Sequence, residues 1–312
     1  RFFSVISYKI ISGIESGEGM KNSFYVVCLT VVLFGFGTGV SAEESSEVRP
    51  DTFTDIESNK DMLDPYNLGL LVERGDVKAI NNVGLLWATG HDGKQSFEEA
   101  VKWWTEAANR GYPLAMNNLG LAYANGQGVD QDIKQAFDWW LKSAIGGNAW
   151  AMNSVGDCYE TGDGVAKDYV LAMTWYKTAA DAGDPLAHYN VGALYQTGQG
   201  VDRNLDTAHD WFMRGAELGD PYSMLSLGDF YRDGFGGQKD LVEALSWYQV
   251  SSLRLDPQDV GNLNFAESEA RSIEGQLNEP QKEEAATRLE YLKKFTAPQM
   301  AEQNLDEGES RI

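Results

Sequence analysis

Tryptophan recurs every 36 residues through the middle of this chain, without an insertion or a deletion. The positions are Trp103, Trp139, Trp175, Trp211 and Trp247. Glycine keeps the same period in three further series, which are Gly75, Gly111, Gly147, Gly183 and Gly219; Gly84, Gly120, Gly156, Gly192 and Gly228; and Gly90, Gly126, Gly162, Gly198 and Gly234. A fixed period of this length is typical of repeat proteins, in which each unit is one supersecondary structure. The chain is therefore predicted to be an array of similar units.

Each unit carries the start and stop signals of two helices. Asp184 and Pro185 suit the N-cap and first turn of one helix, and Gly198 suits a left-handed C-cap that ends it. The second helix begins after a capping residue in every unit: Ser96, Asp132, Asp168, Asn204 and Asp240. Glu99, Gln135 and Glu243 are placed to complete capping boxes. The predicted fold is all-α, an α-solenoid of five 36-residue helix-turn-helix repeats over residues 75–254.

Paired aromatic residues lie on the buried face predicted for each second helix. In one copy this face is formed by Ala136, Trp139, Trp140, Ser143 and Ala144. Their spacing of i, i+3, i+4, i+7 and i+8 is that of an amphipathic helix. We expect both Trp139 and Trp140 to be core residues, one filling its own hairpin and the other packing against the adjacent unit. A platform that stacks sugars or bases is the alternative.

The flanks of the array are predicted to cap it, because terminal repeats need a polar outer face. Residues 64–74 are predicted to form an N-terminal capping helix. Residues 255–296 are predicted to hold two C-terminal capping helices, at 259–276 and 279–295. An acidic linker at 43–63 and an acidic tail at 297–312 are expected to be disordered.

The N-terminal part contains a predicted secretory signal peptide over residues 20–42. Lys21 precedes an uncharged run from 24 to 40, and the small residues of "VSA" at 40–42 favour cleavage after Ala42. An uncleaved membrane anchor is the alternative, because the run is close to the minimum length for spanning a bilayer. Residues 1–19, which begin with Arg1, are interpreted as translated sequence upstream of the native start. Cleavage would leave Cys158 as the only cysteine and exclude an intramolecular disulfide.

Composition and motifs argue against several functions. The 312 residues carry a formal net charge of −22, which argues against a nucleic-acid partner. The Gly-x-Gly loops follow a helix where a nucleotide-binding fold would supply a strand. His91, His188 and His209 occupy different repeat positions without metal-ligand spacing. Cys158 aligns with hydrophobic residues of the first helices, so we expect it to be buried. No catalytic motif is found, and we predict no enzymatic activity, metal or cofactor.

The repeated residues resemble the Sel1-like repeat family, a relative of the tetratricopeptide repeat. The resemblance is carried by stretches such as "AHYNVGALYQTGQGV" and "AMTWYKTAA" and covers five units from residue 75 to about 254. The first unit departs from it in the loop "GHDGKQ" and the fifth in "GFGGQ". The resemblance implies an α-solenoid scaffold for protein complexes without a common enzymatic activity. Some secreted relatives staple each unit with a disulfide, which this chain cannot do.

The resemblance also suggests where a partner would bind. In tetratricopeptide proteins the first helices line a concave groove, and the positions that vary between units lie at i, i+4 and i+7 on one side of each first helix. This variable stripe comprises Asn81, Leu85, Ala88; Asn117, Leu121, Ala124; Asn153, Asp157, Glu160; Tyr189, Ala193, Gln196; and Leu225, Asp229, Arg232. Beside it runs a repeated polar position: Asn82, Asn118, Ser154, Asn190 and Ser226. These side chains could hold an extended peptide backbone, or they could hydrogen-bond between neighbouring helices.

The predicted function is a non-catalytic scaffold or adaptor, exported to the periplasm or outside a bacterium, that binds a partner protein or peptide in the groove. Contact with a membrane is expected only through the export signal. The alternatives are a membrane-anchored adaptor and a hydrolase of cell-wall or β-lactam-like substrates. We expect the variable stripe to face solvent, so that replacing Tyr189 and Asp157 by Ala would leave stability almost unchanged.

Overall fold

The computed structural model describes residues 29–31, 43–45, 65–90, 94–235, 237 and 239–296. Near the N-terminus, strands β1 (Leu29–Val31) and β2 (Glu43–Ser45) pair antiparallel, with Leu29 opposite Ser45. Every other element among these residues is a helix. The predicted cleavage point after Ala42, residues 1–19, the tail at 297–312 and His91 lie outside the described residues, as does the predicted linker apart from β2.

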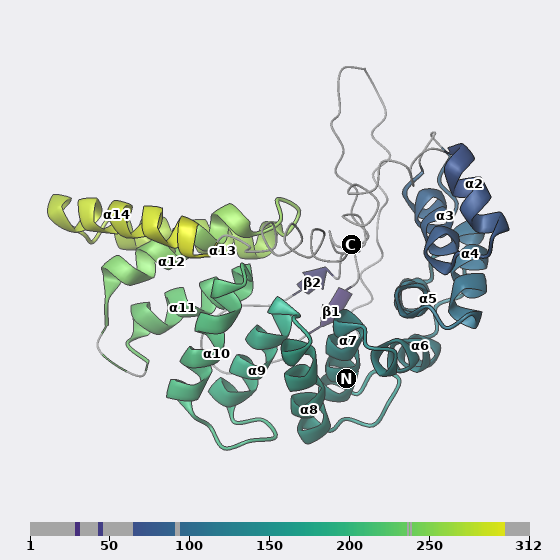
Figure 1. Cartoon of the computed structure of the whole chain (residues 1–312). Coiled ribbons are helices and arrows are strands. Elements are labelled where there is room, and N and C mark those ends of the chain that lie inside the picture. Colours follow the sequence, from purple (N-terminus) through teal and green to yellow (C-terminus); the bar gives the residue numbers. More distant parts are fainter. Residues whose placement is uncertain are drawn as a thin grey trace, which may run out of the picture.

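Five helical hairpins follow one another along the array. They are α3 (Val77–Thr89) with α4 (Phe97–Asn109), α5 (Pro113–Asn125) with α6 (Ile133–Ile145), α7 (Ala149–Thr161) with α8 (Tyr169–Asp181), α9 (Pro185–Thr197) with α10 (Leu205–Glu217), and α11 (Pro221–Asp233) with α12 (Leu241–Arg254). We call these hairpins units one to five. Figure 1 shows them as an arc, with α5 and α7 on its inner side and α6 and α8 on its outer side. The predicted α-solenoid of five repeats is confirmed.

The local sequence signals form the caps expected of them. The first helices end at glycines in the left-handed conformation, such as Gly198 with φ of 76°, whose N–H donates to the Leu194 carbonyl. Each second helix begins with a side chain that accepts a backbone N–H, as Asp132 does from Gln135. In the predicted capping boxes of these helices, the cap side chains accept hydrogen bonds as expected. The reciprocal hydrogen bond, from the cap backbone N–H to the side chain three residues later, was predicted wrongly. The side chain of Glu99 accepts from Lys102, and that of Glu243 pairs with Arg288.

Each hairpin closes by contact between a glycine and an aromatic ring. A Cβ atom added to Gly156 in α7 would lie 2.5 Å from the ring of Tyr176 in α8. The same contact occurs in all five units, between Gly84 and Trp104, Gly120 and Trp140, Gly156 and Tyr176, Gly192 and Phe212, and Gly228 and Tyr248. The periodic glycine therefore lets the two helices of a unit approach across an aromatic side chain.

The two adjacent tryptophans of α6 pack against different parts of the array. Trp140 is buried within its own hairpin against Gly120, whereas Trp139 is half-buried and packs on the core shared by units one and two. Lys142 places its Nζ 4.1 Å from the centroid of the Trp139 ring. The predicted division between own hairpin and adjacent unit is confirmed, but the prediction that both rings belong to the buried core was wrong for Trp139, because one side of the outer helix faces solvent.

Three further helices flank the array. Helix α2 (Pro65–Glu73) precedes unit one, while α13 (Val260–Glu274) and α14 (Glu279–Phe295) follow unit five. Helix α13 takes the place of a further first helix, and its Glu269 pairs with Arg232 of α11. Helix α14 packs on α12, where the Ala285 carbonyl accepts from Ser246. Among the described helices, none has the length and apolar character needed to cross a membrane.

Candidate partner-binding face

The variable stripe lies where adjacent first helices meet, and it divides into a buried and a partly exposed part. The buried members are Asn81, Leu85, Ala88, Asn117, Leu121, Asn153, Leu225 and Asp229. The expectation that the whole stripe faces solvent was wrong for these residues, because successive first helices pack directly against one another there. The partly exposed members are Ala124, Asp157, Glu160, Tyr189, Ala193, Gln196 and Arg232.

The buried amides of the first helices connect neighbouring units. Asn118 donates from Nδ2 to Oδ1 of Asn81 over 3.1 Å, and Asn190 donates to Oδ1 of Asn153 over 2.8 Å. Asn82 accepts from Asn81 over 3.3 Å. Hydrogen bonding between neighbouring helices, one of the two predicted roles, is therefore confirmed for Asn118 and Asn190. Their use as contacts for a peptide backbone stays a prediction.

Tyr189 is held by other aromatic rings. Its ring centroid lies 5.9 Å from that of Phe212 in its own unit and 5.9 Å from that of Tyr222 in the next. Asp157 accepts a hydrogen bond from Tyr176 over 2.7 Å. Replacing these two residues by Ala would remove packing and a partly buried hydrogen bond, so the expectation that stability would stay almost unchanged is corrected.

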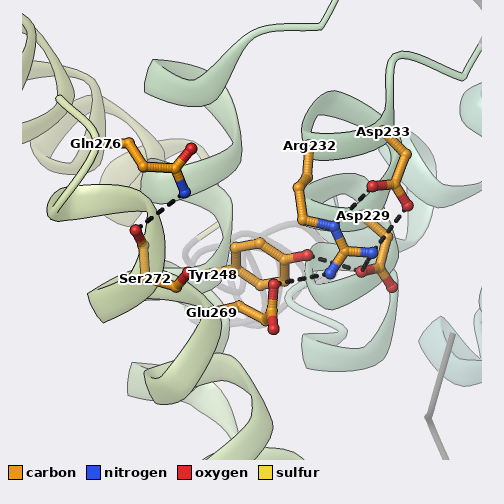
Figure 2. A network of polar contacts seen from close by, with 7 residues as sticks. All are labelled: Asp229, Arg232, Asp233, Tyr248, Glu269, Ser272 and Gln276. Atoms are coloured by element: carbon orange, nitrogen blue, oxygen red, sulfur yellow. Dashed lines mark hydrogen bonds and ion pairs between the residues drawn. The ribbon is translucent and has the colours of Figure 1, made fainter.

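Unit five carries a network of charged groups centred on Arg232 (Figure 2). The guanidinium lies 2.9 Å from a carboxylate oxygen of Asp229, 2.8 Å from Asp233 and 2.9 Å from Glu269 of α13. The hydroxyl of Tyr248 donates to the same Asp229 oxygen over 2.7 Å. Burial raises the pKa of Asp229 to about 6, although Tyr248 and Arg232 both favour its charged form. The network joins the fifth hairpin to α13, the first helix after the array.

Unit three carries a related group of side chains with a different charge. The hydroxyl of Tyr176 lies 2.7 Å from Oδ1 of Asp157 and 2.7 Å from Oε2 of Glu160. Asn153 donates toward the other Asp157 oxygen over 3.4 Å. Burial raises the pKa of Glu160, against the opposing effects of the Tyr176 hydrogen bond and the charge of Lys167. Two partly exposed carboxyl groups of α7 therefore meet one hydroxyl from α8.

The polar role of the two tyrosines was missed from the sequence, where the aromatic positions were assigned to packing alone. A signal was present, because tyrosine occurs at this position only in the two units that carry aspartate 19 residues earlier: Tyr176 with Asp157 and Tyr248 with Asp229. The other units combine Trp or Phe with Leu or Ala. A buried phenol needs a hydrogen-bond partner, which explains the pairing.

The remaining candidate residues for chemistry lie apart from one another. His188 is buried in α9 with its Nδ1 3.1 Å from the Asp184 carbonyl oxygen, and His209 in α10 lies beside the Tyr231 hydroxyl. Burial lowers the pKa of both imidazoles. Cys158 is buried as predicted, and burial raises the pKa of its thiol. Within the described ranges, no three His, Cys, Asp or Glu residues gather as metal ligands would.

Comparison with known proteins agrees with this architecture. The Sel1 repeat model matches residues 77–112, 113–148, 151–184, 185–220 and 221–253. A search of curated proteins found no match. A protective antigen of uropathogenic Escherichia coli strains is similar in structure, with a TM-score of 0.61 and 27% identity over 78% of this chain. This chain spans about half of that protein, because the match covers 52% of its length.

A Sel1 repeat protein from Oxalobacter formigenes is similar as well, with a TM-score of 0.59 and 29% identity. The match covers 78% of this chain and 99% of that protein. The five matched units, their helical hairpins and the periodic glycines together show that this chain belongs to the Sel1 repeat family.

Proposed function

We propose that this protein is a non-catalytic scaffold that binds a partner protein or peptide along the inner side of the arc. Sel1 repeat proteins are generally protein-interaction scaffolds and generally non-catalytic. The proposal rests mainly on one observation, which is that the partly exposed end of the variable stripe changes its chemistry from unit to unit. At one repeat position the side chains are Ala124, Glu160, Gln196 and Arg232 in successive units, whereas the glycines and rings that close the hairpins recur.

The face offers a graded surface to a partner. Unit two presents Ala124, unit three presents two carboxyl groups, unit four presents Tyr189 and Gln196, and unit five presents a guanidinium already held by three carboxylates. Such a sequence of small, acidic and aromatic positions suits an extended segment or a helix that crosses several units. Its specificity would come from differences between units, since the packing residues are shared.

Binding on this face can be tested with matched pairs of substitutions. Ala124→Arg together with Ala193→Arg places two long side chains at partly exposed positions of the inner stripe. Thr174→Arg together with Thr178→Arg adds the same charge at exposed positions of α8. A partner captured with wild-type protein, identified and purified, should bind the α8 pair normally and the inner pair at least about tenfold more weakly. Equal binding to both would contradict the proposal.

We further propose that the protein is exported with cleavage after Ala42. Support comes from Lys21, the uncharged run at 24–40 and the small residues at 40–42. Intact mass of the protein recovered from the exported fraction should correspond to a chain that begins at Glu43. A product that retains residues 20–42 in the membrane fraction would instead favour the membrane-anchored adaptor.

A further inference from the structure

Units three and five carry related side chains at the same repeat positions, 72 residues apart. Asp157 corresponds to Asp229, and Tyr176 corresponds to Tyr248. In both units the tyrosine hydroxyl from the second helix donates to the aspartate of the first helix over 2.7 Å. In both sites, therefore, an aspartate carboxylate of the first helix accepts a hydrogen bond from a phenol of the second helix.

The two sites differ at the next turn of the first helix. Unit five has Arg232 there, whose guanidinium lies 2.9 Å from Asp229. Unit three has Glu160 at the corresponding position, with Oε2 2.7 Å from the Tyr176 hydroxyl. The acids that flank Arg232 also change, because Asp233 and Glu269 correspond to Thr161 and Thr197. Unit five thus contains its own cation, whereas unit three has a second carboxyl group in its place.

We propose that Asp157 and Glu160 bind the guanidinium of an arginine side chain supplied by a partner protein or peptide. This inference rests on the proposed function, because it names one group that the inner face would recognise. Unit five provides the independent observation, since there the same aspartate–tyrosine pair holds a guanidinium from the chain itself. In unit three the arginine would come from outside.

The geometry suits this ligand. Tyr176 is 1% exposed and forms the floor of the site, while Asp157 and Glu160 are partly exposed above it. A hydroxyl has one proton and can donate to only one of the two carboxylate oxygens that it faces at 2.7 Å. Among the described residues, Glu160 forms no ion pair. A guanidinium would bring five N–H donors in a planar fork that can bridge both carboxyl groups.

The test compares two peptides that differ in charge but hardly in shape. One is acetyl-Gly-Gly-Arg-Gly-Gly-amide, and the other has citrulline in place of arginine. Binding to the wild-type chain is followed by calorimetry and by the resonances of ring-labelled tyrosine. We expect the arginine peptide to bind at least about tenfold more tightly, which is about 1.4 kcal/mol, because hydrogen bonds between charged groups are stronger than neutral ones. We also expect it to shift the Tyr176 resonance. Equal binding of the two peptides would overturn the inference.

Variants locate the site and separate it from the general attraction of an acidic protein for cations. Glu160→Gln should lose most of the preference for arginine over citrulline, whereas Glu217→Gln, which removes the same charge at an exposed position of α10, should keep it. Glu160→Arg copies unit five and should fill the site with its own guanidinium, so that the preference disappears. An unchanged preference in Glu160→Gln and Glu160→Arg would overturn the inference.

The wild-type peptide comparison does not depend on any variant being folded. A negative result of this comparison can also be distinguished from a failure of the proposed function. If the two peptides bind alike while Ala124→Arg together with Ala193→Arg still weakens binding of a captured partner at least about tenfold, the inner face is a binding surface and the guanidinium site is rejected.

Discussion

Trp175 and Trp247 occupy the same repeat position two units apart, yet the structure surrounds them differently. Trp175 in α8 is half-buried and packs on the core that includes Ala179 and Ala187. Trp247 in α12 is 0% exposed and shares a core with Leu292 of α14. The same residue in the same repeat position thus has solvent on one side in the interior of the array and a covering helix at its C-terminal end.

The largest expected effect is a difference in stability between truncations of these two tryptophans. Trp247→Ala should lower the free energy of unfolding by about 3–5 kcal/mol, the range for a fully buried large aromatic side chain. Trp175→Ala should lower it by about half as much, because part of its ring remains in water when the protein is folded. Urea unfolding of both variants checks this. Equal losses would mean that the outer surface of the interior units is as well packed as the covered end.

The next effect concerns the covering helix itself. Leu292 of α14 is 0% exposed, and Leu292→Ala should lower the free energy of unfolding by about 2–5 kcal/mol. Glu284→Ala, at an exposed position of the same helix, should change it by less than about 0.5 kcal/mol. Hydrogen exchange would show whether the loss spreads into α12. If Leu292→Ala behaves like Glu284→Ala, α14 contributes little to the end of the array.

The contact that is common to all units gives a smaller but well-controlled effect. Gly156→Ala would place a Cβ atom 2.5 Å from the Tyr176 ring and should destabilise by about 1–3 kcal/mol through overpacking. A Cβ atom added at Gly69 in α2 would meet no other atom within 4 Å. Gly69→Ala should therefore raise the free energy of unfolding by about 0.5–1 kcal/mol, since Ala favours helix more than Gly does. Thermal unfolding midpoints should therefore move in opposite directions, and an unchanged or raised midpoint in Gly156→Ala would contradict the close approach.

The sequence predicted the hairpins well because their determinants are local and repeated. Each cap depends on a residue such as Asp132 or Gly198 and on its neighbours within one turn, so five copies of the pattern point to the same structure. The glycine series also encodes the approach of two helices. The 36-residue sequence pattern therefore predicts most of the fold.

The candidate site was predicted less well because exposure depends on the packing between units. The i, i+4, i+7 spacing placed Asn81 and Glu160 on one side of their helices, but it could not show that the neighbouring first helix covers Asn81 and leaves Glu160 partly exposed. The network around Arg232 involves Glu269 of α13, which lies beyond the last repeat. A pattern that describes one unit contains no information about a partner outside the period.

The last expected effect is a pH dependence at the covered end of the array. The pKa of Asp229 is raised from the ordinary 3.8 to about 6, first by burial and then by the like charges of Asp233 and Glu269. The folded state therefore holds a proton that the unfolded state has released between these two values. The stability that this proton contributes is complete below pH 3.8 and is lost as the pH rises through about 6.

Asp229→Asn removes this titration while keeping an oxygen that can accept from Tyr248. Relative to the variant, the wild type should become less stable by roughly 2 kcal/mol between pH 4 and pH 7. The attraction to Arg232 is already included in this pKa, because the charge of Arg232 lowers the pKa of Asp229 against the larger effect of burial. Urea unfolding of both proteins at several pH values measures the difference. If the wild type instead gains stability relative to Asp229→Asn as the pH rises, attraction to Arg232 outweighs the burial of the carboxylate.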